Sequence, residues 1–187
     1  HFYNPRDDAH DKHARVDGRP FGGGPGMVLK AEPILRAVDR ARGKKRNVKV
    51  ILFTHRGEPL TNERARLLAE TEKHLILIAG HYEGIDERVR DILQPDELSI
   101  GPYVLTGGEL PALVLIDSVV RQIPGVLGDR ESLEERRTPG GATYTRPDVF
   151  TYRRKKYAVP DTLLSGNHRA IEAWRAEKGE GKKGVGA

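Results

Sequence analysis

A glycine-rich segment at residues 99–111 carries the strongest chemical signal in this sequence. It reads Ser-Ile-Gly-Pro-Tyr-Val-Leu-Thr-Gly-Gly-Glu-Leu-Pro and connects a predicted strand to a strongly apolar predicted helix. Glycines let a ligand approach the main chain without obstruction by a Cβ atom, and Pro102 and Pro111 stiffen the segment at both ends. Because tight strand-to-helix connections also use glycine, this segment alone favours ligand binding only modestly.

A second glycine-bearing segment strengthens the case for a binding site. Residues 80–88, which read Gly-His-Tyr-Glu-Gly-Ile-Asp-Glu-Arg, follow a predicted apolar strand over 75–79. In a parallel α/β sheet, ligand-binding loops leave the carboxyl ends of the strands. We therefore expect the two segments to share one site.

Alternating apolar patterns predict the elements that position these segments. We expect helices over 32–42, 61–72, 85–93 and 110–122, with Thr61 as an N-cap, and strands over 48–53, 75–79 and 97–100. This order predicts an α/β fold, with a parallel sheet flanked by helices. The helix over 110–122 is apolar on most sides, and burying it in a chain this short favours a homodimer.

The rest of the chain is more polar. Residues 129–143 predict a loop, and 152–159 a hairpin or extended segment. A last helix follows, capped by Ser165 or Asn167, and the lysine- and glycine-rich tail is expected to be flexible.

Composition limits the classes of function. The 187 residues fit one domain, and the net charge of +5 favours an anionic partner. The sequence has no apolar run long enough to cross a bilayer and no secretory leader, so we expect a cytoplasmic protein. Without cysteine, disulfides and thiolate metal sites are excluded.

Three clusters of basic residues are candidates for phosphate contacts. The first, between Arg36 and Arg46, lies at a predicted helix end, where cations also offset the helix dipole. The second is Arg136–Arg137. The third, residues 153–156, is flanked by Tyr152 and Tyr157, whose rings could stack on unpaired bases or be ordinary strand residues.

Common nucleotide and metal motifs are missing from the sequence. No P-loop is present, and the glycines of residues 21–26 lack the spacing of a dinucleotide-binding loop. His10 and His13 stand among aspartates, but a surface polar cluster or an RNA contact is favoured over a metal site. We therefore predict no metal ligands.

Spaced motifs run in order through nearly the whole chain. They include Asn4-Pro5-Arg6-Asp7, residues 19–27, residues 80–88, residues 99–111, residues 123–128, Tyr144-Thr145-Arg146-Pro147 and residues 163–168. Together they closely resemble the motifs of the bacterial tRNA (guanine-N1)-methyltransferases, which modify the guanosine 3′ of the anticodon at tRNA position 37.

The resemblance implies a knotted (SPOUT) methyltransferase domain over 1–175 and a flexible basic tail over 176–187. It implies a deep trefoil knot, tRNA as substrate, and an obligate homodimer with the active site at its interface. It also implies S-adenosylmethionine bound in the knot. Relatives depend on magnesium, so magnesium is a candidate cofactor, although no magnesium site is recognisable here. The implied cofactor-binding residues are Gly80, Ile100, Gly101, Pro102, Tyr103, Val104, Leu105, Gly107, Gly108 and Pro111.

Methylation of guanine N1 requires removal of a proton and stabilisation of negative charge on the base. By resemblance, Glu83 addresses the guanine edge, Arg130 stands beside the place of the catalytic arginine, and Asp148 is another acidic residue of the site. The family's usual general base, an aspartate, is replaced by Gly140. The candidate bases that remain are Glu131, Glu134, Glu135 and Asp148.

Two classes of function stay open. One is an active methyltransferase, and the other is a cofactor- or RNA-binding relative with weak or no activity, suggested by Gly140. Both chain ends also look short, so we expect the family's first strand and its C-terminal helical domain to be missing. His81 is a further departure, because relatives usually carry arginine there.

Overall fold

The computed structural model describes residues 1–127 and 142–180, with side chains up to residue 177 in the second range. Its contacts divide the chain into two compact units, His1–Val126 and Leu127–Ala187. The helices in the described ranges are all too short or too polar to cross a membrane.

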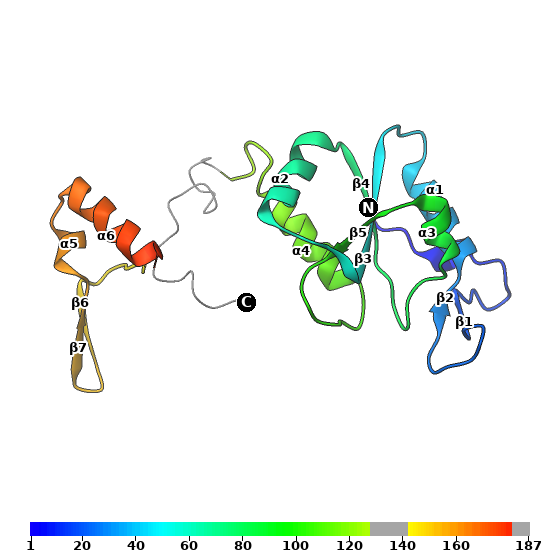
Figure 1. The fold of residues 1–187 in the computed structure, drawn as a ribbon, viewed down its shortest axis with the longest axis horizontal. Helices are drawn as coiled ribbons and strands as arrows, with labels where there is room; N and C mark the ends of the chain where they lie inside the picture. The colour runs from blue at the N-terminus through cyan, green and yellow to red at the C-terminus, as the bar shows by residue number, and fades with distance from the viewer. Residues whose placement is uncertain (128–141, 181–187) are drawn as a thin grey trace. The chain divides into compact units, whose positions relative to one another are not determined.

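The N-terminal unit is built on a three-stranded parallel sheet with the order β4-β3-β5 (Figure 1). The strands are β3 (Val48–Pro59), β4 (His74–Ile78) and β5 (Asp96–Ser99). The sequence predicted all three, but β3 is longer than expected. Its register shifts after Phe53, and Glu58 and Pro59 pair with β5 again. The predicted α/β class, with a parallel sheet and flanking helices, is confirmed.

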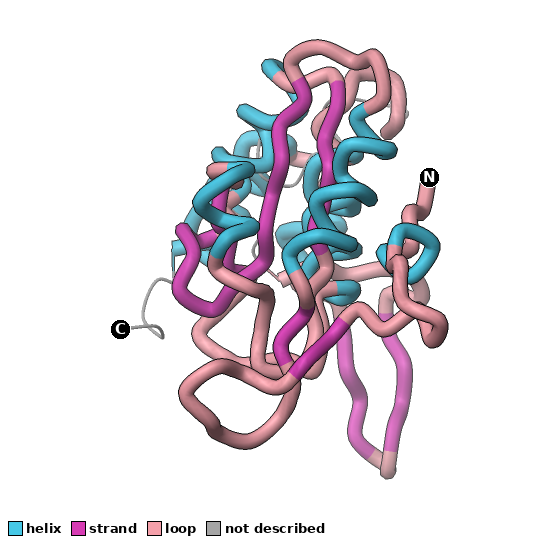
Figure 2. Tube along the Cα trace, turned by 90° about the vertical axis from the view of Figure 1, so that its right-hand side faces the viewer, coloured by secondary structure: helices cyan, strands magenta, loops and turns pink. Residues whose placement is uncertain are grey.

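Helices cover both faces of this sheet. Successive β3 side chains point to opposite faces, so β3 contributes apolar residues to both. On one face, Val50 and Leu52 pack with α1 (Ala31–Arg42) and α3 (Arg88–Leu93). On the other face, Ile51 packs with α2 (Asn62–Thr71) and α4 (Glu109–Val120). Figure 2 shows the strands running side by side among these helices. The sheet therefore separates two hydrophobic cores.

The start of α2 follows a local signal, whereas the start of α3 depends on long-range pairing. The Thr61 side chain accepts a hydrogen bond from Arg64 N at 3.1 Å, which confirms the predicted N-cap of α2. The start predicted for α3 at residue 85 is wrong, because Ile85 forms a β-bridge with Leu29 and Asp86 N donates to Leu29 O at 2.9 Å. The helix can begin only after this extended pairing ends, at Arg88.

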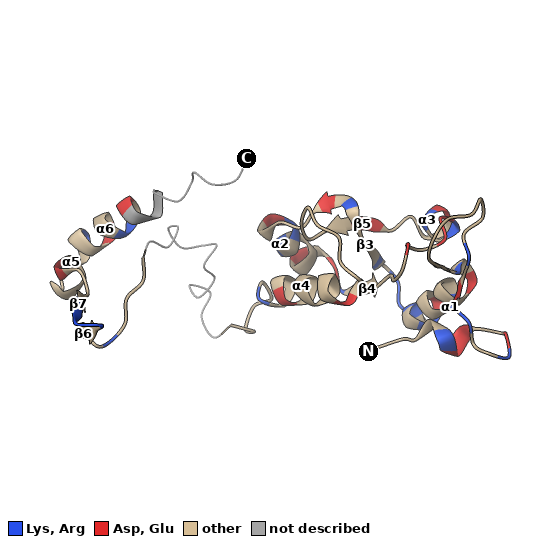
Figure 3. Ribbon diagram, turned by 90° about the horizontal axis from the view of Figure 1, so that it is seen from below, with Lys and Arg blue, Asp and Glu red and all other residues tan. Residues whose placement is uncertain are grey.

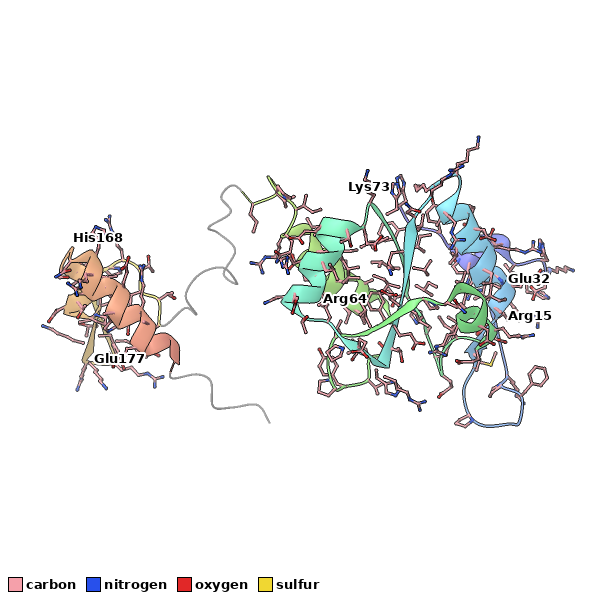
Figure 4. The ribbon with its side chains drawn as sticks, turned by 45° about the horizontal axis from the view of Figure 1, so that its top comes forward. Arg15, Glu32, Arg64, Lys73, His168 and Glu177 are labelled. Carbon is pink, nitrogen blue, oxygen red and sulfur yellow. The ribbon has the colours of Figure 1, made fainter. Side chains whose placement is uncertain are left out.

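Charged side chains connect the outer helices to their neighbours. Arg40 of α1 contacts Asp8 at 2.8 Å and Asp7 at 3.4 Å, both in the 3-10 helix η1 (Pro5–Asp8). Arg64 of α2, labelled in Figure 4, forms a salt bridge with Asp96 at the start of β5. A short antiparallel pair, β1 (Asp17–Gly18) with β2 (Val28–Leu29), completes the N-terminal unit.

Helix α4 is only partly buried within one chain. Leu115 and Val119 face the second core, with 0% and 7% of their surface exposed. By contrast, Leu110 and Leu113 are 60% and 59% exposed. The sequence predicted an apolar helix with more surface than one chain buries, and the structure has that exposed apolar face.

The C-terminal unit contains a hairpin and two helices. The strands β6 (Val149–Tyr152) and β7 (Lys155–Ala158) pair antiparallel, and α5 (Asp161–Leu164) and α6 (His168–Glu180) follow. Asn167 Oδ1 accepts a hydrogen bond from Ala170 N at 3.2 Å, so Asn167 caps α6. Helix α6 continues through 176–180, where the tail was expected to start, and 181–187 lie outside the described residues.

Candidate functional site

The two glycine-bearing segments meet at the carboxyl edge of the sheet. One follows β4 and the other follows β5, so they leave the sheet on either side of β3. Gly108 N donates a hydrogen bond to Gly80 O at 2.8 Å, and His81 forms a β-bridge with Gly107. The structure therefore brings together the segments that the sequence predicted to share a site.

Gly108 is required by the close approach of these segments. A Cβ atom there would lie 2.5 Å from Ala79 Cα and 2.8 Å from Gly80 N, and these backbone atoms cannot move aside separately. At Gly107 a Cβ atom would meet Glu109 Oε2 at 2.5 Å and His81 Cε1 at 2.8 Å. Those are ends of flexible side chains, so Gly108 is the stricter requirement of the two.

The segment after β5 is held in a tight bend by its own side chains. Buried Ser99 donates to Gly101 O at 3.0 Å and accepts from Gly101 N at 3.3 Å. The hydroxyl of Tyr103 donates to Ile100 O at 3.0 Å, and its ring occupies the place where a Gly101 Cβ would lie. Past this bend, the main-chain groups of Val104 and Leu105 make no hydrogen bonds to other described residues. They are open to water or to a ligand.

A side-chain pair also joins the two segments. Glu109, in the first turn of α4, accepts a hydrogen bond from His81 in the segment after β4. This hydrogen bond lowers the pKa of Glu109, against the opposing effect of partial burial. No role was predicted for either residue from the sequence. A carboxylate in a first helical turn was foreseeable from the helix dipole, but its partner was not.

Glu83 lies against another glycine-rich stretch. Its main-chain N donates to Met27 O at 3.1 Å, and a Cβ atom at Gly26 would lie 2.4 Å from its Cγ and Oε1. Gly26 has φ +77°, a conformation that side chains other than glycine rarely adopt. The glycines of residues 21–26 do not have the spacing of a dinucleotide-binding loop. They instead border the predicted guanine-contacting carboxylate.

Comparison with known proteins identifies this arrangement. The family model described as tRNA (Guanine-1)-methyltransferase TrmD matches residues 1–184. The chain belongs to this family.

Individual relatives are similar over almost the whole chain. A tRNA (guanine-N(1)-)-methyltransferase of Alcanivorax borkumensis is 50% identical over 186 residues, covering 96% of this chain and 68% of the relative. One of Dechloromonas aromatica is 48% identical, covering 94% and 71%. One of Brevibacillus brevis is 50% identical, covering 95% and 72%.

The predicted catalytic residues of this TrmD-family chain are distributed over both units. Glu83 is in the N-terminal unit, and its side chain is exposed. Asp148 belongs to the C-terminal unit, where its main-chain O accepts from Val159 N at 2.8 Å. Four predicted residues lie outside the described residues, namely Arg130, Glu131, Glu134 and Glu135.

The histidine–aspartate cluster near the N-terminus is occupied by internal contacts. Asp11 accepts from His13 N at 2.9 Å and from Arg15 N at 3.0 Å, and its other oxygen contacts Arg15 Nε at 3.1 Å. These bonds, chiefly the one from the Arg15 main chain, lower the pKa of Asp11 to about 2. Within the described ranges, no group of three or more histidine, aspartate or glutamate side chains could hold a metal ion.

Proposed function

We propose that this protein transfers a methyl group from S-adenosylmethionine to N1 of the guanosine at position 37 of tRNA. The observation that carries the proposal is the contact of Gly108 with Gly80, which joins the two glycine segments in a chain of the TrmD family. Relatives that share about half of its residues are named tRNA (guanine-N(1)-)-methyltransferases.

The joined segments supply the proposed cofactor site. Its open main-chain groups at Val104 and Leu105 suit the polar edge of an adenine, and the side-chain-free surface at Gly107 and Gly108 suits close approach of a ligand. S-adenosylmethionine would supply an electrophilic methyl group there. The remaining residues of the proposed site are Gly80, Ile100, Gly101, Pro102, Tyr103 and Pro111. We further propose that these segments form the trefoil knot of the family.

The reacting guanine needs a base and a counter-charge, because N1 is protonated at neutral pH. Glu83 is proposed to contact the guanine edge, since its main chain is fixed by Met27 and its side chain remains exposed. Arg130 would stabilise the negative charge that develops on the base. Asp148 or one of the glutamates at 131, 134 and 135 would remove the proton, in the place of the aspartate that Gly140 replaces.

Assembly into a homodimer would cover the exposed side of α4 and complete the active site at the interface. Its exposed apolar residues are Leu110, Leu113, Val114, Ile116 and Val120. Such a face is typical of an interaction surface. Leu113→Lys should convert the dimer to monomer in analytical ultracentrifugation, whereas Leu67→Lys, at an exposed leucine of α2, should not. Equal sedimentation of both variants and the parent as dimers would place the interface elsewhere.

Single-turnover methylation tests the proposed reaction. Two tRNA transcripts that carry guanosine or adenosine at position 37 are incubated with excess protein and radiolabelled S-adenosylmethionine. Methyl transfer to the guanosine transcript alone supports the proposal. Cofactor binding without transfer to either transcript would instead favour the second candidate, a cofactor- or RNA-binding relative without activity, which the replacement of the family aspartate by Gly140 suggests.

The same assay identifies the general base. Glu131, Glu134, Glu135 and Asp148 are replaced singly by alanine, and the rate is measured as a function of pH. The variant that lacks the base should have a lower rate. Its rate should also no longer fall at low pH in the way that protonation of the base causes in the parent. If all four variants keep the parent's rate and profile, none of these carboxylates is the base.

A further inference from the structure

The β6–β7 hairpin presents its aromatic residues on one face. Phe150 pairs with Tyr157 across the strands, and Tyr152 pairs with Lys155. Directly opposite residues share a face, as do residues two apart on one strand, so all four side chains lie on the same side. The rings of Phe150 and Tyr157 are stacked with centroids 5.4 Å apart. We call these four residues the aromatic face.

The aromatic face is uncovered within its unit. Phe150, Tyr152 and Tyr157 are 54%, 55% and 42% exposed, and every residue of both strands is exposed. Two-stranded ribbons of this kind are at best marginally stable alone in water. Three exposed aromatic rings on such a ribbon indicate a surface that binds something.

Four consecutive cations at residues 153–156 form the turn and the start of β7, with Lys155 on the aromatic face and Lys156, opposite Thr151, on the other face. Arg153 lies over the Tyr152 ring at 5.2 Å, and Lys155 over the Tyr157 ring at 5.5 Å. None of the four forms an ion pair with a described residue, and the hairpin contains no acidic residue. The cations of α1 differ, because Arg36 contacts Glu32 at 2.6 Å and Arg40 contacts Asp8 at 2.8 Å. Figure 3 colours the lysine and arginine residues of the hairpin blue.

The turn between β6 and β7 has a backbone conformation that is unfavourable for the residues that form it. Arg153 and Arg154 are the two central residues, with φ of 48° and 65°. A two-residue turn with positive φ at both central positions strongly favours Asn-Gly. Positive φ is sterically disfavoured for most residues other than glycine, asparagine and aspartate. Arginine at both positions therefore does not serve the stability of the turn.

We propose that the aromatic face and the cations of residues 153–156 bind unpaired nucleotides of RNA. Exposed bases stack on aromatic rings, and adjacent cations contact phosphates. The charge pattern favours RNA over a protein partner, because consecutive phosphates of an RNA strand supply counter-charges for four adjacent cations. The proposal rests on the proposed function in that the RNA is the anticodon loop of the tRNA substrate.

The test measures binding of a fluorescent anticodon stem–loop RNA to the full chain by anisotropy, at several salt concentrations. Tyr152→Ala removes a stacking ring, and Tyr152→Phe restores it. The double variant Arg153→Asn/Arg154→Gly removes two cations and gives the turn its preferred residues. Its matched control is Arg66→Gln/Lys73→Gln, which removes two cations on and just after α2, outside the three basic clusters. Thermal unfolding, cofactor affinity and methylation at saturating tRNA are measured for every variant.

We expect Tyr152→Ala to weaken RNA binding about tenfold, and Tyr152→Phe to bind like the parent. The Asn-Gly variant should lower the slope of log affinity against log salt by roughly 1.4, as loss of two phosphate contacts to a single strand predicts, without lowering its melting temperature. The control should keep the parent's slope. A fully paired RNA duplex should show no loss of binding on Tyr152→Ala.

Other results overturn the proposal. If the parent methylates tRNA and the hairpin variants bind the stem–loop like the parent, the hairpin proposal fails while the proposed function stands. If Tyr152→Ala weakens binding to the paired RNA equally, unpaired bases are not the ligand. A parent that binds S-adenosylmethionine but neither binds nor methylates tRNA contradicts the proposed function as well.

Discussion

The two units of the chain differ in how they hold their functional groups. In the N-terminal unit, buried side chains fill both faces of a sheet, and the candidate cofactor site is formed by main chain packed against main chain at Gly108 and Gly80. In the C-terminal unit, none of residues 142–177 is buried, and the functional candidates are exposed side chains on a hairpin. Substitutions at the candidate cofactor site of the first unit should therefore change both stability and binding, whereas substitutions on the hairpin of the second unit should change binding alone.

The sharpest test of this difference removes a leucine from each unit. Leu115 of α4 is fully buried, so Leu115→Ala should lower the free energy of unfolding by about 2–5 kcal/mol, through lost burial and the cavity left behind. Leu164 of α5 is 52% exposed, and Leu164→Ala should change it by less than about 0.5 kcal/mol. Urea denaturation followed by circular dichroism measures both. Similar losses in the two variants would contradict the contrast.

A Cβ atom at the junction of the glycine segments should disturb stability and binding together. Gly108→Ala forces apart backbone atoms of Ala79 and Gly80, which we expect to cost roughly 1–3 kcal/mol and to abolish S-adenosylmethionine binding in calorimetry. Gly18→Ala is the control, because its nearest neighbour would be Lys30 Cε at 3.9 Å. Gly107→Val should also abolish binding by filling ligand space. Unchanged affinity in both site variants would refute the site.

Removing one helix cap from each unit should have a smaller effect on stability. Thr61→Ala removes the hydrogen bond to Arg64 N and should lower the free energy of unfolding by about 1 kcal/mol. Asn167→Ala removes the equivalent bond to Ala170 N. It should increase hydrogen exchange in α6 without changing exchange in the buried strands. A global loss of protection in the Asn167 variant would show that the units unfold together.

The smallest expected effect is the pH dependence of the Glu109–His81 contact. The pKa of Glu109 is lowered from its usual 4.5, so its ionised form is favoured in the folded protein. Its contribution to stability is full above about pH 4.5 and is lost as the pH falls through the folded-state pKa. Because the Glu109 side chain is 59% exposed, the change should be small. Unfolding of Glu109→Gln at pH 7 and pH 3 should show a correspondingly weaker pH dependence than the parent.

Periodicity in the sequence was enough to predict the parallel sheet, the helices on its faces and the Thr61 cap, because these depend on local spacing and burial. It did not predict contacts that depend on distant pairing. Helix α3 begins later than predicted, because Ile85 pairs with Leu29, 56 positions earlier in the chain. The contact of Gly26 with Glu83 and the pair of His81 with Glu109 likewise join residues whose spacing has no period. The site was thus foreseen at the level of segments and missed at the level of side-chain partners.

Helix α4 connects two surfaces that serve different purposes. Its first residue, Glu109, contacts His81 at the glycine segments, and its exposed apolar residues extend from Leu110 to Val120. In the proposed dimer, cofactor occupancy and subunit association would both act on this one rigid element. Linkage requires the two effects to be reciprocal. If cofactor binding strengthens association, association strengthens cofactor binding by the same factor, and dilution of the protein should weaken its apparent affinity for the cofactor.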